Sequence, residues 1–490
     1  MHHVVDPATA ALPIESLPTL GTEIRRLIRL GLPIIGTTLS GMLLGFTDFV
    51  MVSRLGTEAT AAISPCTMLL YSVLCLGLGM SNSVQTFSAQ AVGSKQPKEA
   101  AAYAWQSLYV AVLFALLAYP VTTAMPRLWA LVGHEPTVQA MEVAYSEVVL
   151  WCMPLAILCV GLEGFFNGIQ RPKVALVSVL AAVVFNVIAN YVFIFGKLGV
   201  PAMGIRGAAV ATLIAWTVRL FILAILFRGR DFHREYDSRN QWQPSLQRLR
   251  GILHVGGPTG VQWTLDVGSW FIFLTVLIAG FGTATLAASN IALQFMHISF
   301  MAALGVGSAV TTLVGHAIGE RKHDLAALRA KSGMVLTASY MFLIGLLFLL
   351  TGRWLVGLLS NDPEVIDTGA RVLLWAALFQ VFDAMGIAYV HALRGAGDTR
   401  WPAALVIVCN WGVFICGGYL VSRYLPQLGY HGPWMMCALY IILIGLALRA
   451  RFLHGAWRKI ELFKQDAAAP TVVTDVPTAV CDVEQVGVGA

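Results

Sequence analysis

The stretch that decides the fold is Gly256–Phe273, GGPTGVQWTLDVGSWFIF. It opens an apolar run from Val255 to Leu293 in which the only acidic or basic residue, histidine included, is Asp266. About 20 apolar residues, each rising 1.5 Å, cross the ~30 Å hydrocarbon core of a bilayer, so this run predicts a membrane helix. Asp266 lies near mid-depth, where a carboxylate costs roughly 2.5–3.5 kcal/mol on insertion scales. An aspartate at that depth is either retained for function or held neutral.

The composition extends this prediction to the whole chain. Of its 490 residues, 57% are hydrophobic and 12% are charged, and the mean hydropathy is +0.73. A soluble domain carries about 25% charged residues, so the composition is that of a polytopic membrane protein. The apolar runs reach helix length and lack the roughly ten-residue alternation of an outer-membrane barrel. The predicted fold class is therefore all-α.

Twelve membrane-spanning helices are predicted from these runs. The second and eighth are unusually long, so we expect them to tilt or to project beyond the bilayer. The predicted spans are 29–52, 60–92, 104–125, 146–168, 175–196, 206–227, 252–280, 285–318, 332–352, 368–392, 403–424 and 432–453.

The basic residues predict the orientation of these spans. An even number of spans places both termini on one face, and that face carries 24 of the 32 lysines and arginines. The other face carries seven, and Arg219 lies within a span. By the positive-inside rule the basic face is cytoplasmic, so both termini are predicted to be cytoplasmic. This placement explains the net charge of +6 without a nucleic-acid partner.

The two halves of the chain repeat one another. Pro33 in GLP corresponds to Pro258 in GGP, 225 residues later. Three glycine pairs share an offset of 226 residues: Gly56 with Gly282, Gly79 with Gly305, and Gly93 with Gly319. Chance similarity between apolar sequences rarely keeps glycines in register over such a length. Because each unit has six spans, the halves have the same orientation and form parallel repeats about an axis along the membrane normal.

The predicted organisation follows from the spans and the repeat. It comprises a cytoplasmic N-terminal tail (1–28), an N-lobe (29–227), a cytoplasmic linker (228–251), a C-lobe (252–457) and a disordered cytoplasmic tail (458–490).

Three aspartates lie inside predicted spans: Asp48, Asp266 and Asp383. A fourth acid, Glu163, is predicted near the cytoplasmic end of its span, where it reaches water. No clear cation neutralises the aspartates from within the spans, so desolvation and mutual repulsion disfavour their charged form. Each could exchange a proton or hold Na⁺ together with carbonyl and hydroxyl oxygens. The alternative is a permanently protonated side chain bonded to a backbone carbonyl, but three such residues favour function.

The aspartates do not occupy equivalent positions in the two repeats. The residue 226 positions after Asp48 is Leu274, and the residue 226 positions before Asp266 is Ser40. Each lobe is therefore predicted to carry its own polar chemistry. In the N-lobe, Asn186 and Asn190 stand four residues apart on one helix face. They either hydrogen-bond between helices or ligate an ion together with Asp48.

No enzyme signature is present. The sequence contains no HExxH, no GxSxG and no GxxxxGK[ST] motif, so no metalloprotease, hydrolase or ATP-driven motor is indicated. Energy for transport would have to come from an ion gradient. The buried acids are the residues able to use one.

With these features the chain resembles the multidrug and toxin extrusion (MATE) family, in its bacterial NorM-like branch. The matching segments are GLPIIGTTLSGMLLGFTDFVMVSRLG (31–56), GLGMSNSVQTFSAQAVG (77–93), NVIANYVFIFGKLGVPAMGIRGAAVAT (186–212), the GGP-to-Asp266 stretch and FQVFDAMGIAYVHALRGAGDT (379–399). The last is the most specific, because the family has an aspartate in its tenth helix followed by a similarly placed LRGxxDT. Related proteins often carry Glu where this chain has Asp266.

The resemblance implies two six-helix lobes in a V, with a central cavity open to one side at a time. It implies antiport, in which Na⁺ or H⁺ enters while a bulky, often cationic drug leaves. Asp266 and Asp383 would form the C-lobe coupling site, with Na⁺ as one candidate ion. Asp48 would form the N-lobe polar site with Asn186, Asn190 and Thr212. Some relatives carry Asp at the position of Asn190.

Small organic molecules and membrane lipid are the expected partners, with no nucleic acid and no cofactor other than the coupling ion. We expect a monomer in the bacterial inner membrane. One alternative is a lipid-linked precursor flippase of similar two-lobed design, which would need a cationic cavity for pyrophosphate. A non-transporting receptor or scaffold is a third reading, and the repeat and the buried acids argue against it.

Overall fold

A computed structural model describes residues 17–463, which form helices joined by short turns. Eleven helices within this range are long and apolar enough to cross a membrane. A bent pair, α4 (Pro136–Val149) and α5 (Cys152–Gly168), supplies the twelfth span with a bend of 41°. Pro154 lies three residues into α5 and has no N–H to donate to the carbonyl of Leu150, so the helix breaks just before it. The predicted count of twelve spans is met when this pair is one span.

The remaining spans of the first half overlap the predicted ranges, but α1 begins nine residues before its range and α3 extends seven residues beyond its range at each end. They are α1 (Leu20–Ser53), α2 (Thr57–Gly93), α3 (Pro97–Val132), α6 (Lys173–Phe195) and α7 (Ile205–Phe227). A short helix, α8 (Arg230–Tyr236), lies in the linker.

The spans of the second half include two that change helix type along their length. The seventh span is α9 (Leu246–Ile272) continued by the π-helix η1 (Phe273–Ile278) and the 3₁₀ turn η2 (Ala279–Phe281). The eleventh is α13 (Arg400–Val408), the π-helix η3 (Cys409–Gly417) and α14 (Gly418–Tyr424). The others are α10 (Thr283–Gly319), α11 (His323–Gly357), α12 (Pro363–Ala396) and α15 (His431–His454), with short 3₁₀ turns η4 (Pro426–Leu428) and η5 (Ala456–Lys459).

The helix bounds confirm the internal repeat. Helices α2 and α10 each have 37 residues, and their first residues, Thr57 and Thr283, are 226 positions apart. Each is preceded by a glycine with positive φ, +119° at Gly56 and +102° at Gly282. Only glycine adopts such a backbone without strain, so the same residue type ends the same turn in both lobes.

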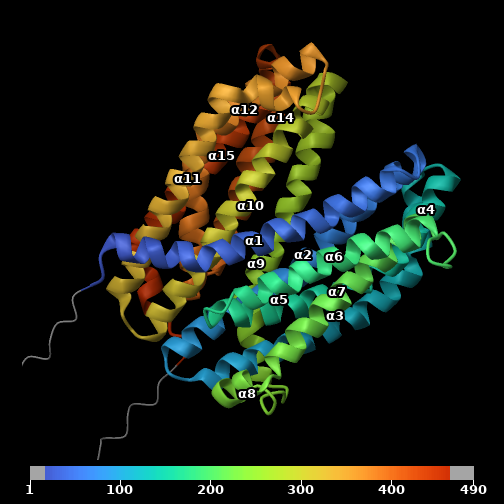
Figure 1. Ribbon diagram of the computed structural model, residues 1–490. Helices are drawn as coiled ribbons and strands as arrows, with labels where there is room; N and C mark the ends of the chain where they lie inside the picture. Colours follow the sequence, from blue (N-terminus) through green and yellow to red (C-terminus); the bar gives the residue numbers. More distant parts are fainter. Residues whose placement is uncertain (1–16, 464–490) are drawn as a thin grey trace, which may run out of the picture.

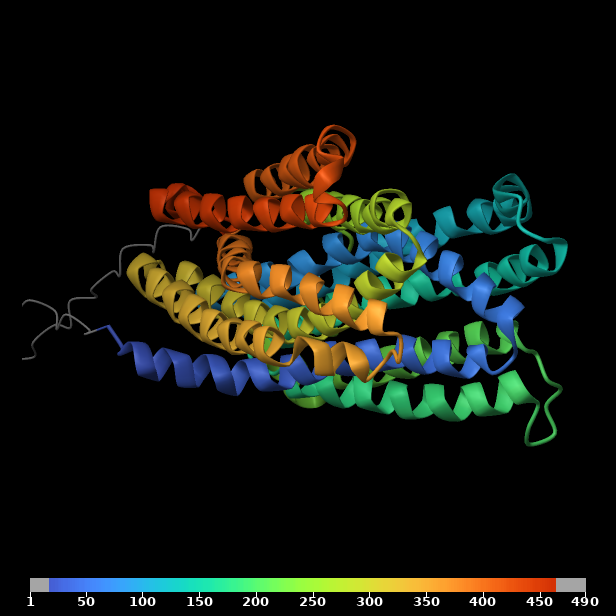
Figure 2. The ribbon, with the colours of Figure 1, turned by 90° about the horizontal axis from the view of Figure 1, so that it is seen from above.

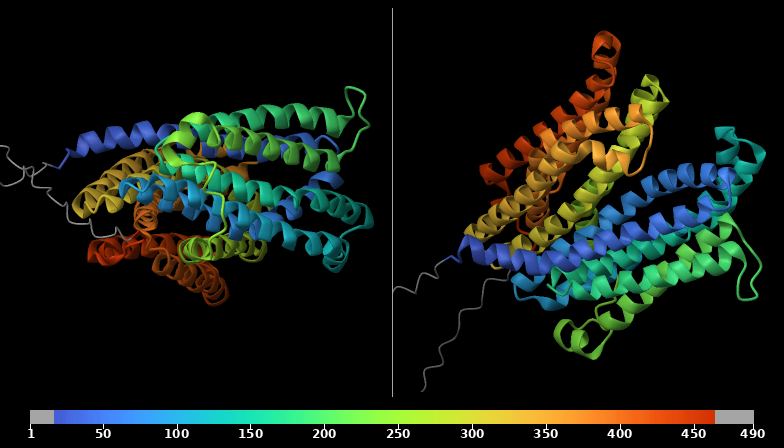
Figure 3. Two further views of the ribbon diagram at one scale, coloured as in Figure 1. Left: turned by 90° about the horizontal axis from the view of Figure 1, so that it is seen from below. Right: turned by 45° about the horizontal axis from the view of Figure 1, so that its top comes forward.

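The two lobes form a V (Figure 1). Helices α1–α7 make one arm and α9–α15 the other, and the arms converge at the end of the molecule where α1 begins (Figures 1 and 3). Seen from above, α6 and α15 lie at opposite edges of the molecule (Figure 2). This arrangement confirms the predicted fold class.

The lobes are joined by symmetry-related helix pairs, α1 against α10 and α2 against α9. Glycines allow the backbones to meet: a Cβ at Gly79 would meet the backbone of Gly260, and one at Gly93 would meet that of Gly319. Small residues at such crossings give close packing, which drives helix association in lipid. Gln90 Nε2 on α2 also donates a hydrogen bond to Gly395 O on α12 at 2.8 Å, which adds a polar contact between the lobes.

The end of the described chain differs from the predicted disordered tail. Residues Ala456–Lys459 form η5, and the Phe463 ring packs against Phe87 and Tyr103 with centroids 6.3 and 5.9 Å apart. Aromatic burial against the N-lobe holds this segment in place. The rest of the predicted tail, 464–490, lies outside the described residues.

Candidate functional site

Asp48 on α1 lies at the centre of a buried polar cluster in the N-lobe. Its Oδ1 accepts hydrogen bonds from Asn186 Nδ2 at 3.0 Å and Asn190 Nδ2 at 2.6 Å, both on α6. Its Oδ2 accepts one from Thr212 Oγ1 on α7 at 2.5 Å. None of these four residues is more than 9% exposed. The structure therefore brings together all four residues predicted for the N-lobe.

This cluster can satisfy two protonation states of Asp48. Thr212 Oγ1 also lies 3.0 Å from the carbonyl of Ala208, but a hydroxyl has one proton to donate. When Asp48 is ionised, Thr212 donates to the carboxylate. When Asp48 is protonated, its own O–H can donate to Thr212, which then donates to Ala208. In addition, Asn190 Oδ1 is buried with no hydrogen-bond partner, which leaves an oxygen free to face a cation.

In the C-lobe, Asp266 on α9 is only half-buried and has one polar partner. Asn410 Nδ2 on η3 donates to Asp266 Oδ1 at 2.7 Å. Asn410 lies at the start of the π-helical segment, and η1 begins seven residues after Asp266. π-Helical segments inside α-helices are frequently found at functional sites. Of the two π-helical segments in the described residues, one supplies the partner of this acid and the other follows it in the same span.

Asp383 on α12 differs from both other aspartates. It is half-buried, and within residues 17–463 it makes no hydrogen bond or ion pair. Asp266 lies within electrostatic range of it, as do Cys437 and Tyr440 on α15. The structure thus places the two C-lobe acids in one neighbourhood, with no lysine or arginine paired to either among the described residues.

Two charged side chains, Glu163 and Arg394, have different surroundings from those predicted. Glu163 does not reach water as predicted, because Arg219 Nη2 donates to its Oε2 at 2.5 Å. The Glu163 side chain is 17% exposed and the Arg219 side chain 8%. Arg394, one of the 24 basic residues predicted for the cytoplasmic face, is buried on α12. Its guanidinium lies 5.6 Å from the Trp263 ring and 3.4 Å from Gln262 Oε1.

Asn410 was not among the predicted site residues. The available signal was its position as a lone amide within the apolar span 403–424. That signal does not identify the partner, because Asn410 and Asp266 are 144 positions apart.

Two parallel six-helix lobes with unpaired carboxylates inside the spans define a membrane transporter. A family model described as MatE matches residues 33–192 and 266–420. These ranges make up more than half of the chain, so the protein belongs to the MatE family.

Relatives of known name extend over nearly the whole chain. A Shewanella oneidensis protein, "Probable multidrug resistance protein NorM", is 27% identical over 456 residues, covering 91% of this chain and 98% of its own. A Rhizobium meliloti protein of the same name is 29% identical, covering 92% and 96%.

Solved structures share the fold. A MATE crystal structure in complex with MaL6 has a TM-score of 0.82 at 20% identity, covering 89% of this chain and 98% of its own. An outward-facing multidrug resistance MATE family transporter has a TM-score of 0.79 at 20% identity, covering 89% and 97%.

Proposed function

We propose that this protein is a secondary active efflux transporter that exports bulky, often cationic organic compounds in antiport with Na⁺ or H⁺. The observation that carries the proposal is the pair Asp266 and Asp383, two carboxylates in one neighbourhood whose one side-chain hydrogen bond among the described residues is donated by the neutral Asn410 to Asp266. Such a pair attracts cations and gains from neutralisation. The names of the NorM relatives support the class of compound.

The coupling argument is one of differential affinity. A cationic compound and the coupling ion compete for the same carboxylates, so loading one favours the conformation that releases the other. Asp48, with Asn186, Asn190 and Thr212, is the proposed N-lobe site, where a proton or Na⁺ can be accepted. We place the chain in the bacterial inner membrane with both termini cytoplasmic, so the lobes converge on the cytoplasmic side and the V opens outward.

The test is dye efflux from proteoliposomes with a Na⁺ gradient and a pH gradient imposed separately. Efflux driven by one gradient and reduced to background by Asp266→Asn or Asp383→Asn would support the proposal and identify the ion. The matched control is Asp367→Asn, near the start of α12, where the half-buried carboxylate pairs with Arg353. Dye movement that ignores both gradients and both substitutions would contradict coupling through these acids.

A precursor flippase is the second candidate. Arg394 favours it to a limited degree, as a buried guanidinium without an acidic partner among the described residues. A cationic cavity for pyrophosphate would need more than one such group. Movement of a lipid-linked precursor, with no dye efflux under either gradient, would favour this reading.

A further inference from the structure

The linker between the lobes forms, with α3 and α7, a cavity of about 320 Å³ on the N-lobe. Its lining combines two arginines with aromatic and aliphatic side chains: Trp105, Leu108, Tyr109, Arg228, Arg239 and Trp242. The cavity lies near the start of α3 and at the end of α7, at the basic end of the N-lobe.

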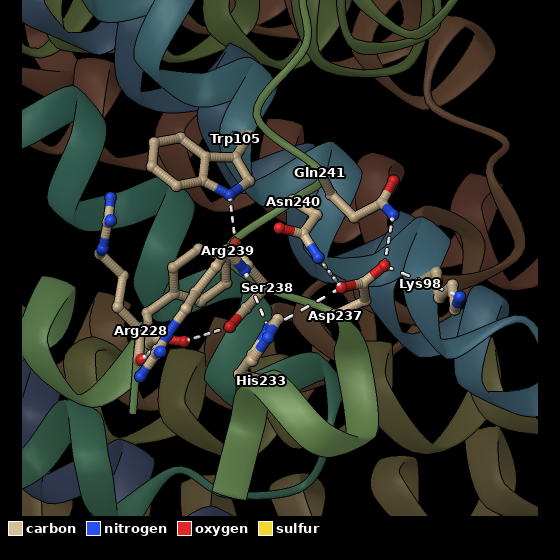
Figure 4. A network of polar contacts seen from close by, with 10 residues as sticks. Lys98, Trp105, Arg228, His233, Asp237, Ser238, Arg239, Asn240 and Gln241 are labelled. Atoms are coloured by element: carbon tan, nitrogen blue, oxygen red, sulfur yellow. Dashed lines mark hydrogen bonds and ion pairs between the residues drawn. The ribbon is translucent and has the colours of Figure 1, made fainter. Parts of the chain in front are cut away.

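The linker is fixed in place around this cavity by hydrogen bonds to both helices. Trp105 Nε1 donates to Ser238 O at 2.6 Å, and Ser238 Oγ donates to Phe227 O at 2.6 Å (Figure 4). Tyr109 Oη donates to Trp242 O. Two of these hydrogen bonds end on linker carbonyls and one on the last carbonyl of α7, so both helices hold the linker at the cavity wall.

The two arginines that line the cavity have no acidic partner among residues 17–463. Arg239 Nε donates to the carbonyl of Arg228 at 2.8 Å, and both side chains are exposed. Asp237, an acid of the linker, is contacted instead by Gln241, Asn240, Lys98 and His233 (Figure 4). The hydrogen bond from Gln241 is the main reason that the pKa of Asp237 lies below its usual value. Two guanidinium groups therefore remain available to an anion.

Exposed apolar surface runs from this cavity along both helices. On α3, Val112 and Leu116 are 47% and 68% exposed and share a helix face with Trp105 and Tyr109. On α7, Phe221 and Ile225 are 66% and 53% exposed and share a face with Arg228. The helices are in contact here, since the Trp105 and Phe227 rings lie 5.8 Å apart.

Such a surface matches the form of a phospholipid. Acyl chains lie on exposed apolar helix faces, while arginine, tryptophan and tyrosine gather at the level of the headgroups. The lining contains no carboxylate to meet a choline or ethanolamine cation. We propose that this cavity binds the phosphate headgroup of an anionic phospholipid, with the acyl chains along α3 and α7. The site is separate from the aspartates and does not depend on ion coupling.

The test is native mass spectrometry of the full-length protein in detergent, with equal amounts of phosphatidylglycerol and phosphatidylcholine. We expect preferential retention of phosphatidylglycerol. Each of Arg228→Gln and Arg239→Gln should lower its affinity about fivefold, and the double variant about 30-fold. The matched control is Arg230→Gln with Arg234→Gln, which removes the same charge from α8 outside the cavity lining.

Three results would overturn the proposal: equal retention of the two lipids, an equal loss in the α8 control, or full displacement of the lipid by glycerol phosphate. The last would show a site for a soluble phosphate. Because the double glutamine variant can fail to fold, Arg228→Lys with Arg239→Lys is measured beside it. Retention of phosphatidylglycerol by the lysine variant, with its charges intact, supports the proposal, and loss to the level of the glutamine variant contradicts it.

Discussion

The two lobes share a backbone plan but not their acid chemistry. Helices α2 and α10 have equal length, and each is preceded by a glycine. In contrast, Asp48 accepts hydrogen bonds from three side-chain donors, whereas Asp383 accepts none within the described residues. The first aspartate is hydrogen-bonded within its lobe, and the second is half-buried without a hydrogen-bond partner among the described residues. The repeat therefore preserves helix geometry and leaves each lobe free to carry a different site.

A second contrast lies where the lobes meet. Glu23 on α1 pairs with Arg329 on α11 at 3.1 Å, and at the symmetry-related contact Arg248 on α9 pairs with Glu99 on α3 at 2.8 Å. The first pair is buried, with side chains 4% and 3% exposed. The second is 25% and 32% exposed. The two symmetry-related ion pairs therefore differ in solvation: the Glu23–Arg329 pair is buried, and the Arg248–Glu99 pair is partly exposed to water.

The largest effect is expected at the buried pair. Arg329→Gln leaves the Glu23 carboxylate buried without a cation, which should destabilise the protein by about 3–5 kcal/mol. The measurement is the free energy of unfolding in a mixed-micelle titration. Adding Glu23→Gln should recover part of the loss, because the unpaired charge is then removed. A single variant as stable as the unmodified protein would show that water reaches this pair.

Asp48 should come next. Asp48→Ala leaves the Asn186 and Asn190 amides without their acceptor, at about 1–3 kcal/mol for each buried donor left unpaired. Asp48→Asn should cost much less, because its amide can donate to Thr212 while its oxygen accepts from both asparagines. Asp383→Ala should cost less than Asp48→Ala, because it leaves no side-chain donor without its acceptor. Equal losses for Asp48→Ala and Asp383→Ala would remove the distinction between the lobes.

The glycine crossing on the symmetry axis gives a smaller effect. In Gly93→Ala the new Cβ would meet backbone atoms of His316 and Gly319, which cannot move aside as a side chain can. Overpacking of this kind costs about 1–3 kcal/mol. The control is Gly41→Ala on α1, where nothing lies within 4 Å and the change should stabilise the helix by roughly 0.5–1 kcal/mol. Thermal unfolding of both variants, followed by tryptophan fluorescence, should show shifts of opposite sign.

The smallest effect is expected at the partly exposed pair. Arg248→Gln should lower the free energy of unfolding by less than about 1 kcal/mol, because water solvates the remaining Glu99 carboxylate. The same mixed-micelle titration used for Arg329→Gln measures it. A loss as large as that at Arg329 would mean that burial does not distinguish the two symmetry-related contacts.

The individual acids of the site could be predicted from the sequence, because an aspartate within an apolar run stands out in the sequence. Asp48, Asp266 and Asp383 were found in this way, and the i, i+4 spacing of Asn186 and Asn190 placed two amides on one face. The partners could not be found so directly. Asn410 reaches Asp266 across 144 positions, and Arg219 reaches Glu163 across 56, through helices whose mutual rotation no local pattern specifies.

The sequence by itself determined the number of spans, their approximate bounds and the repeat, because apolarity and glycine register are properties of short stretches and of fixed offsets. Only the tertiary structure decided which charges are buried, which acid has hydrogen-bond donors around it and which has none among the described residues, and where the linker lines a cavity. These outcomes depend on how helices distant in sequence pack, and packing sets the local access of water to each polar group.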